Sequence, residues 1–133
     1  MPFEGLNYLA ILACGVASMA IGALYYSPLV AGKAWMKEVN FDPETAASPM
    51  PAMIKSTIAS LILAVGIAVM LKMSGTTGAV DGARLGFTLG LLVVAAASFP
   101  NYAYENKTLK HFLIHIGYTV ITMTVMGAIL GAW

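Results

Sequence analysis

The sequence has little charge and a single cysteine, and both shortages narrow what the protein can be. Charged residues make up 10% and hydrophobic residues 59% of the 133 residues, whereas a soluble domain has roughly 25% charged residues. A globule of this size cannot bury so much apolar surface, so we expect the chain to lie in a bilayer. The net charge of +1 gives no reason to expect a nucleic-acid partner. Cys14 has no second cysteine for an internal disulfide or a thiolate metal cluster.

Long apolar runs are the main pattern of the chain. They cover about residues 6–26, 52–71, 83–99 and 112–133. Each is close to the ~20 residues that cross ~30 Å of hydrocarbon as a helix. The runs lack the alternation of polar and apolar residues that membrane strands show. The sequence therefore predicts an all-α, four-helix transmembrane bundle that forms a single integral membrane domain over residues 1–133.

Several residues predict where the helices begin and end. Ser48 and Pro49 suit the N-cap and first turn of the second helix, and Gly75 suits its C-terminal end. We expect Asp81 to cap the third helix and Pro100 to close it. The first connection is too long for a plain loop.

Within that connection, basic residues repeat with the period of a helix. Lys33, Lys37 and Asn40 fall on one helical face, and Trp35 lies away from it. This pattern predicts a short interfacial helix with its lysines toward the headgroups. An irregular loop is the alternative.

The basic residues also favour one end of the bundle. Five lysines lie there, at positions 33, 37, 55, 107 and 110, whereas Lys72 and Arg84 lie at the other end. The positive-inside rule places the five-lysine end in the cytoplasm and both termini on the outer side. We expect a multi-pass protein of the cell membrane, which in a bacterium is the inner membrane. No Lys or Arg precedes the first run, so we expect a permanent span rather than a cleaved signal.

Small residues recur at every fourth position of the runs. The first two runs carry Ala10, Cys14, Ser18 and Gly22, then Ser56, Ser60, Ala64 and Ala68; the last two carry Gly82, Gly86 and Gly90, then Gly127 and Gly131. In lipid, helices attract one another mainly through close backbone approach. The glycines predict a tight seam, either within one chain or between subunits. A unit this small favours a homo-oligomer or a place in a larger membrane complex.

Polar residues gather at the five-lysine end, and they form the candidate site. Its members are Tyr26, Ser27, Lys33, Lys55, Asn101, Tyr102, Glu105, His111 and His115. His111 and His115 are one helical turn apart, and Thr119 and Thr122 continue from His115 toward the bilayer. Ionisable groups inside a membrane are costly and often functional.

Three interpretations of the histidines stay open. They are neutral, hydrogen-bonded structural residues; or they contact a proton or a substrate; or they bind a metal. A metal needs a third ligand, and Glu105 is the nearest along the chain. Because a histidine pair by itself is a weak signal for a metal site, we expect no metal. We also expect no cofactor. Glu105 can instead pair with Lys55 or Lys107, and the aromatic residues can form an ordinary interfacial belt.

Several short motifs together resemble the DUF1761 family. They are Tyr26–Leu29 with Gly32, Lys33 and Trp35; Asn101–Tyr102; Tyr104–Leu109; Gly117–Tyr118; and Met126–Trp133. The resemblance implies a small four-helix membrane protein of the kind found in bacteria and fungi. Because the family's function is unknown, the resemblance supplies no catalytic residues. Residues 104–108 read Tyr-Glu-Asn-Lys-Thr where the family usually has Phe-Glu-x-Arg-Ser, which loses the bidentate geometry of arginine.

The sequence contains no nucleophile–base pair, no phosphate-binding loop and no quinone-type motif, so catalysis is disfavoured. We expect a non-enzymatic protein that assembles with itself or serves as an accessory subunit. The alternative is a small transporter or channel that uses the polar residues of the five-lysine end. A lesser alternative is an enzyme that acts on a lipid or a quinone.

Overall fold

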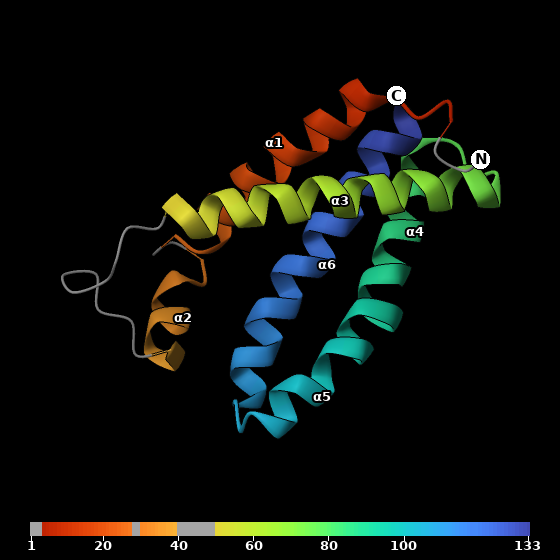
Figure 1. The fold of residues 1–133 in the computed structure, drawn as a ribbon. Helices are drawn as coiled ribbons and strands as arrows, with labels where there is room; N and C mark the ends of the chain where they lie inside the picture. Colours follow the sequence, from red (N-terminus) through yellow and green to blue (C-terminus); the bar gives the residue numbers. More distant parts are fainter. Residues whose placement is uncertain (1–3, 28–29, 40–49) are drawn as a thin grey trace.

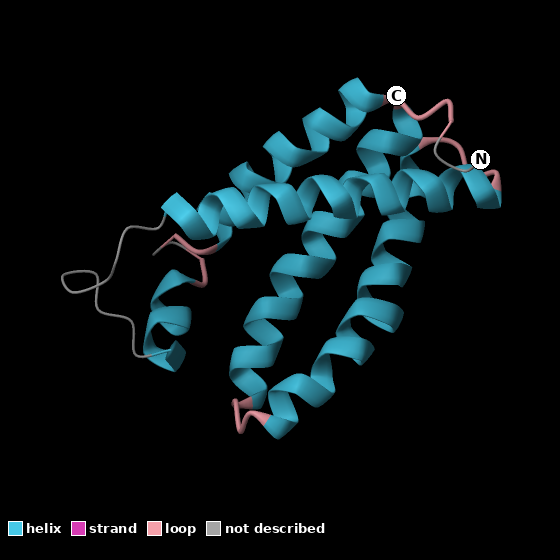
Figure 2. Ribbon diagram, viewed as in Figure 1, coloured by secondary structure: helices cyan, strands magenta, loops and turns pink. Residues whose placement is uncertain are grey.

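The computed structural model describes residues 4–27, 30–39 and 50–133, and its regular structure there is entirely helical (Figures 1 and 2). Helices long and apolar enough to cross a membrane are α1 (Tyr8–Tyr25), α3 (Met50–Ser74), Ala79–Tyr104 and α6 (Leu109–Ala132). A short helix, α2 (Gly32–Val39), lies in the first connection, with Lys33 and Lys37 exposed. The expected all-α architecture with four spans is confirmed.

The third span is a continuous helix with a π-helical segment in its middle. It comprises α4 (Ala79–Thr88), η1 (Leu89–Ala95) and α5 (Ala96–Tyr104). The expected helix end at Pro100 is wrong, because α5 continues through Pro100. A proline removes one backbone hydrogen bond, a loss that transmembrane helices tolerate better than soluble ones do. The span is therefore longer than the apolar run suggests.

The helix ends bear out one expected signal and contradict another. Gly75 has a φ of 68° directly after α3, as expected of the residue that ends a helix. The expected cap by Asp81 is wrong, since Gly78 is the N-cap of α4 and Asp81 lies in its first turn. There Asp81 pairs with Arg84 at 3.3 Å. The expected cap at residues 48–49 and Asn40 lie outside the described residues.

The tightest helix contact joins α4 to α6 through glycines. A Cβ atom on Gly82 would overlap the carbonyl oxygen of Gly127, and one on Gly86 would overlap that of Met123. At the end of this seam, the Gly78 amide donates to the Gly131 carbonyl at 2.8 Å. The two backbones thus touch directly, which is how helices gain attraction in lipid. The glycine rows pack within the chain.

The main core lies where α1, α3 and α6 meet. Cys14 of α1, Ala64 and Ile67 of α3 and Met126 of α6 are each at most 1% exposed. The small side chains of α1 and α3 allow these helices to approach closely, and Ile67 and Met126 fill the remaining space. α3 crosses in front of α6 in Figure 1, so its N-terminal half extends beyond this core.

The two ends of the bundle differ. The C-terminus lies at the end of the bundle where the Lys72 amine donates to the Glu4 carbonyl (Figure 1). Helix α2 and the turn at residues 105–108 lie away from the C-terminus, and this is the five-lysine end. The arrangement creates a hollow beside α2, and two of the nine candidate site residues line it.

Candidate functional site

A groove of about 710 Å³ opens between α1, α2, α3 and α6 at the five-lysine end. Its walls are mostly apolar, with Met19 and Ala23 on α1 and Met53 and Ala59 on α3. The groove lies beside the C-terminal half of α1 and the N-terminal half of α3, which are parts of membrane spans. Most ligand sites have this combination of apolar walls and a few placed polar groups.

Aromatic rings form one side of the groove. The ring of Tyr26 lies 5.5 Å from that of Tyr118 and 5.9 Å from that of Trp35, measured between centroids. The Tyr118 hydroxyl donates to the Ser18 carbonyl at 3.2 Å, and the Tyr25 hydroxyl donates to the Ile114 carbonyl at 2.6 Å. These bonds tie the end of α1 to α6, so the rings occupy fixed positions. We refer to Tyr26, Trp35 and Tyr118 as the aromatic wall.

The turn after α1 carries Trp35 to this wall. The Gly32 amide donates to the Ser27 carbonyl at 2.9 Å. Gly32 is buried, and a Cβ atom there would overlap the Tyr26 carbonyl oxygen. Because only glycine fits, the start of α2 folds back against the end of α1. One turn later, Trp35 reaches the ring of Tyr26.

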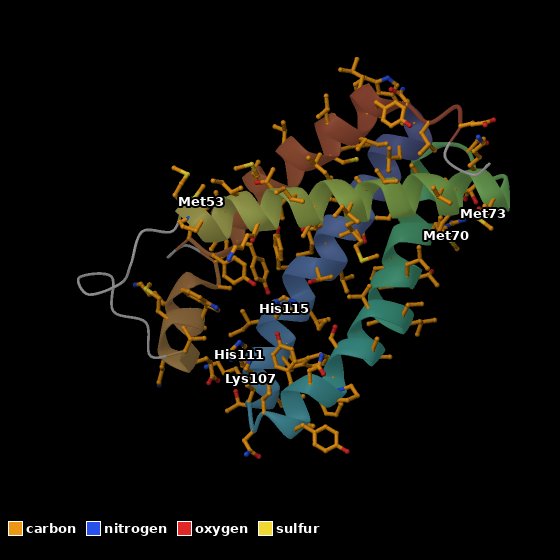
Figure 3. The ribbon with its side chains drawn as sticks, in the orientation of Figure 1. Met53, Met70, Met73, Lys107, His111 and His115 are labelled. Atoms are coloured by element: carbon orange, nitrogen blue, oxygen red, sulfur yellow. The ribbon has the colours of Figure 1, made fainter. Side chains whose placement is uncertain are left out.

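His115 connects the groove to a second group of polar residues. It lines the groove from α6, and its ring lies 6.0 Å from that of Tyr102 on α5. Tyr102 also contacts His111, at 5.4 Å between centroids. The Lys107 amine lies 5.1 Å from the centroid of the Tyr102 ring. In Figure 3, His115, His111 and Lys107 follow one another along one side of α6 toward the turn at residues 105–108.

Glu105 pairs with Lys107 rather than Lys55, at 3.0 Å. Because the Lys107 ammonium donates a hydrogen bond to the Glu105 carboxylate, the pKa of Lys107 is raised above its usual value. Both side chains are largely exposed, so the pair adds little stability. It holds the lysine over Tyr102, outside the groove.

The structure thus divides the expected site residues. Tyr26 and His115 line the groove, whereas Tyr102, Glu105 and His111 form the neighbouring group around Lys107. The remaining expected residues do not line it: Ser27 donates to the Leu24 carbonyl, and Lys33, Lys55 and Asn101 are exposed elsewhere.

The polar stripe beyond His115 also leaves the groove. The Thr119 hydroxyl donates to the His115 carbonyl of its own helix at 3.1 Å, and Thr122 is buried in the bundle. The sequence prediction omits Tyr118, which lines the groove three residues after His115. Its spacing from His115 places both on one face of α6 and is the signal that could have found it.

The polar groups that line the groove are hydroxyls and one imidazole. Within the described residues, the hydroxyls of Tyr26, Ser56 and Ser60 and the ring of His115 make no side-chain hydrogen bond to protein. A phenol or serine hydroxyl both donates and accepts, and so does a neutral imidazole. In the described ranges, no group of His, Cys, Asp and Glu residues is arranged to hold a metal ion. The groove therefore offers hydroxyl and imidazole groups that can form hydrogen bonds.

The fold and groove together define a multi-pass, all-α membrane protein with a ligand-sized hollow at one end of its bundle. The chain belongs to the DUF1761 family, described as proteins of unknown function, which matches residues 9–131. This confirms the resemblance that the short motifs suggest. No curated protein and no solved structure matches the chain.

Proposed function

We propose that the protein binds an amphiphilic small molecule within the membrane, in the groove beside α2. The observation that carries this proposal is a hollow with apolar walls and unpartnered polar groups at one end. Polar groups without partners in an apolar setting are unfavourable, and a ligand head that hydrogen-bonds to His115 and Tyr26 removes that cost. The ligand's hydrocarbon tail covers the apolar walls.

Storage, presentation or carriage of the ligand fits this geometry better than a channel does. Beyond the groove, Cys14, Ala64, Ile67 and Met126 fill the space between α1, α3 and α6. A carrier would need a second conformation that opens this core. Catalysis has less support, because His115 is the groove's one strong acid–base candidate and Glu105 is engaged with Lys107 outside it.

Assembly with itself, or as an accessory subunit of a larger complex, is the second candidate. The observation in its favour is Gly66 on α3, which faces open space: a Cβ atom there would have no neighbouring atom within 4 Å. The small residues of the repeating rows, to which Gly66 does not belong, pack within the chain or line the groove, which weakens this candidate. Crosslinking in native membranes tests it. A strictly monomeric protein with no co-purifying partner would remove it.

Ligand binding is tested with purified protein in lipid nanodiscs and a photoreactive alkyl probe. We expect saturable labelling of residues on α1 and α3 that line the groove. His115→Ala removes a hydrogen bond to the head, so the affinity falls about threefold to tenfold. Ala23→Phe fills the groove from α1 and abolishes saturable labelling.

The matched control is Thr88→Ala on α4. The Thr88 hydroxyl donates to the Arg84 carbonyl of its own helix at 2.8 Å, near the opposite end of the bundle. Its labelling should equal that of the unaltered protein. Equal labelling of all the variants, Ala23→Phe included, would overturn the proposal.

A further inference from the structure

The shape of the aromatic wall indicates what kind of head group the groove takes. Its rings are in mutual contact, with centroids 5.5 and 5.9 Å apart, and the ring planes are inclined at 54° and 69°. They offer a surface for a flat ring to pack against.

The charge of the lining points the same way. The described residues that line the groove include no Asp, Glu, Lys or Arg. A phosphate head favours Arg or Lys at hydrogen-bond distance, and a free ammonium favours a carboxylate. The nearby lysines 33 and 55 are exposed and absent from the lining. An uncharged head therefore fits best.

His115 can bind either a carbonyl oxygen or a hydroxyl group of the ligand head. A neutral imidazole donates from one nitrogen to a carbonyl oxygen, and it accepts at the other nitrogen from a hydroxyl. Within the described part of the chain, the Tyr26 hydroxyl makes no hydrogen bond to protein, and it too can donate and accept. The groove thus offers both a stacking surface and hydrogen-bonding groups to the same ligand head.

We propose that the head is a flat, uncharged ring bearing carbonyl or hydroxyl oxygens, such as a quinone or quinol, on a hydrocarbon tail. The inference rests on the proposed binding of an amphiphile in this groove. The ring packs against Tyr26, Tyr118 and Trp35, an oxygen bonds to His115, and the tail runs between α1 and α3.

Fluorescence of Trp35 tests the inference directly. The chain has two tryptophans, so Trp133→Phe leaves Trp35 as the sole one. The probe is a decyl-substituted benzoquinone, titrated into this variant in nanodiscs. We expect saturable quenching, because the quinone ring contacts the indole. Decyl phosphocholine and decyl phosphate should displace the quinone at least about tenfold more weakly than decyl hydroquinone does.

Two variants at Tyr26 distinguish the contribution of its ring to quinone binding from that of its hydroxyl. Tyr26→Leu removes a ring and should weaken quinone binding about tenfold, whereas Tyr26→Phe removes one hydrogen bond and should weaken it about threefold. The Ala23→Phe variant, whose groove is filled, is the background control: its quenching measures quinone that is dissolved in the lipid and not bound in the groove. Circular dichroism and size exclusion confirm that each variant is folded.

The outcomes distinguish the two proposals. If decyl phosphocholine or decyl phosphate competes as well as the hydroquinone, amphiphile binding stands and the ring preference is wrong. If quenching in Ala23→Phe equals that in the parent, no groove binding occurs and both proposals fail.

Discussion

At the scale of single residues, Thr122 holds a hydroxyl that the fold leaves without a partner. The side chain is 3% exposed, and its Oγ1 makes no hydrogen bond within the described residues. Burying an unpaired hydroxyl costs about 1–3 kcal/mol. Valine has the same shape without the hydroxyl. Thr122→Val should therefore leave stability unchanged or raise it by about 1 kcal/mol, measured by unfolding in mixed detergent micelles.

Thr124 provides the comparison on the same helix. Its hydroxyl donates to the Val120 carbonyl at 2.7 Å, so Thr124→Val loses a formed bond and should cost up to about 1 kcal/mol. A larger loss for Thr122→Val than for Thr124→Val would contradict the assignment of an unpaired hydroxyl.

At the scale of helices, the seam between α4 and α6 limits what can stand at Gly86. A Cβ there would overlap the Met123 carbonyl, which is backbone and cannot rotate away. Gly86→Ala should force the helices apart and cost about 1–3 kcal/mol or more. Gly66→Ala on α3 is the control, because its Cβ meets open space and alanine favours a helix by up to ~1 kcal/mol. The measurement is thermal unfolding of both variants in detergent. Equal stability of Gly86→Ala and Gly66→Ala would refute a tight seam.

Helix boundaries show where local signals succeed. Gly75 ends α3 as expected, because a positive φ is a local requirement that glycine meets without strain. Pro100 does not end its helix, and the π-helical segment Leu89–Ala95 has no clear signal in the sequence. Transmembrane helices tolerate an internal proline, and local π-helical segments can take up freed backbone groups.

At the scale of the whole molecule, the two ends carry unequal charge, which predicts orientation. The five-lysine end should face the cytoplasm, and the turn near Gly75 should face outward. Cysteines test this in a Cys14→Ser background. Thr77→Cys, which is exposed, should react with an impermeant maleimide on intact cells. Tyr104→Cys, 89% exposed, should react only after permeabilisation. The reverse pattern would mean that the charge rule misplaces this protein.

The candidate site was only partly predictable. His115 and Tyr26 stand out because each places a polar group beside an apolar run, and both line the groove. Lys33, Lys55 and Asn101 belong to the same end of the bundle and are exposed, yet they do not line the groove. Sequence position gives depth in the membrane, but it does not give the direction of a side chain around a packed helix.

The sequence by itself determined the helical class, the number of spans and the polar end, because apolar run length and charge placement act locally against the bilayer. The tertiary structure alone decided that Gly82 meets Gly127 and that Tyr26, Trp35, His115 and Tyr118 surround one groove. These partners lie far apart along the chain. Their meeting depends on how closely whole helices approach, which the shapes of all the packed side chains set together.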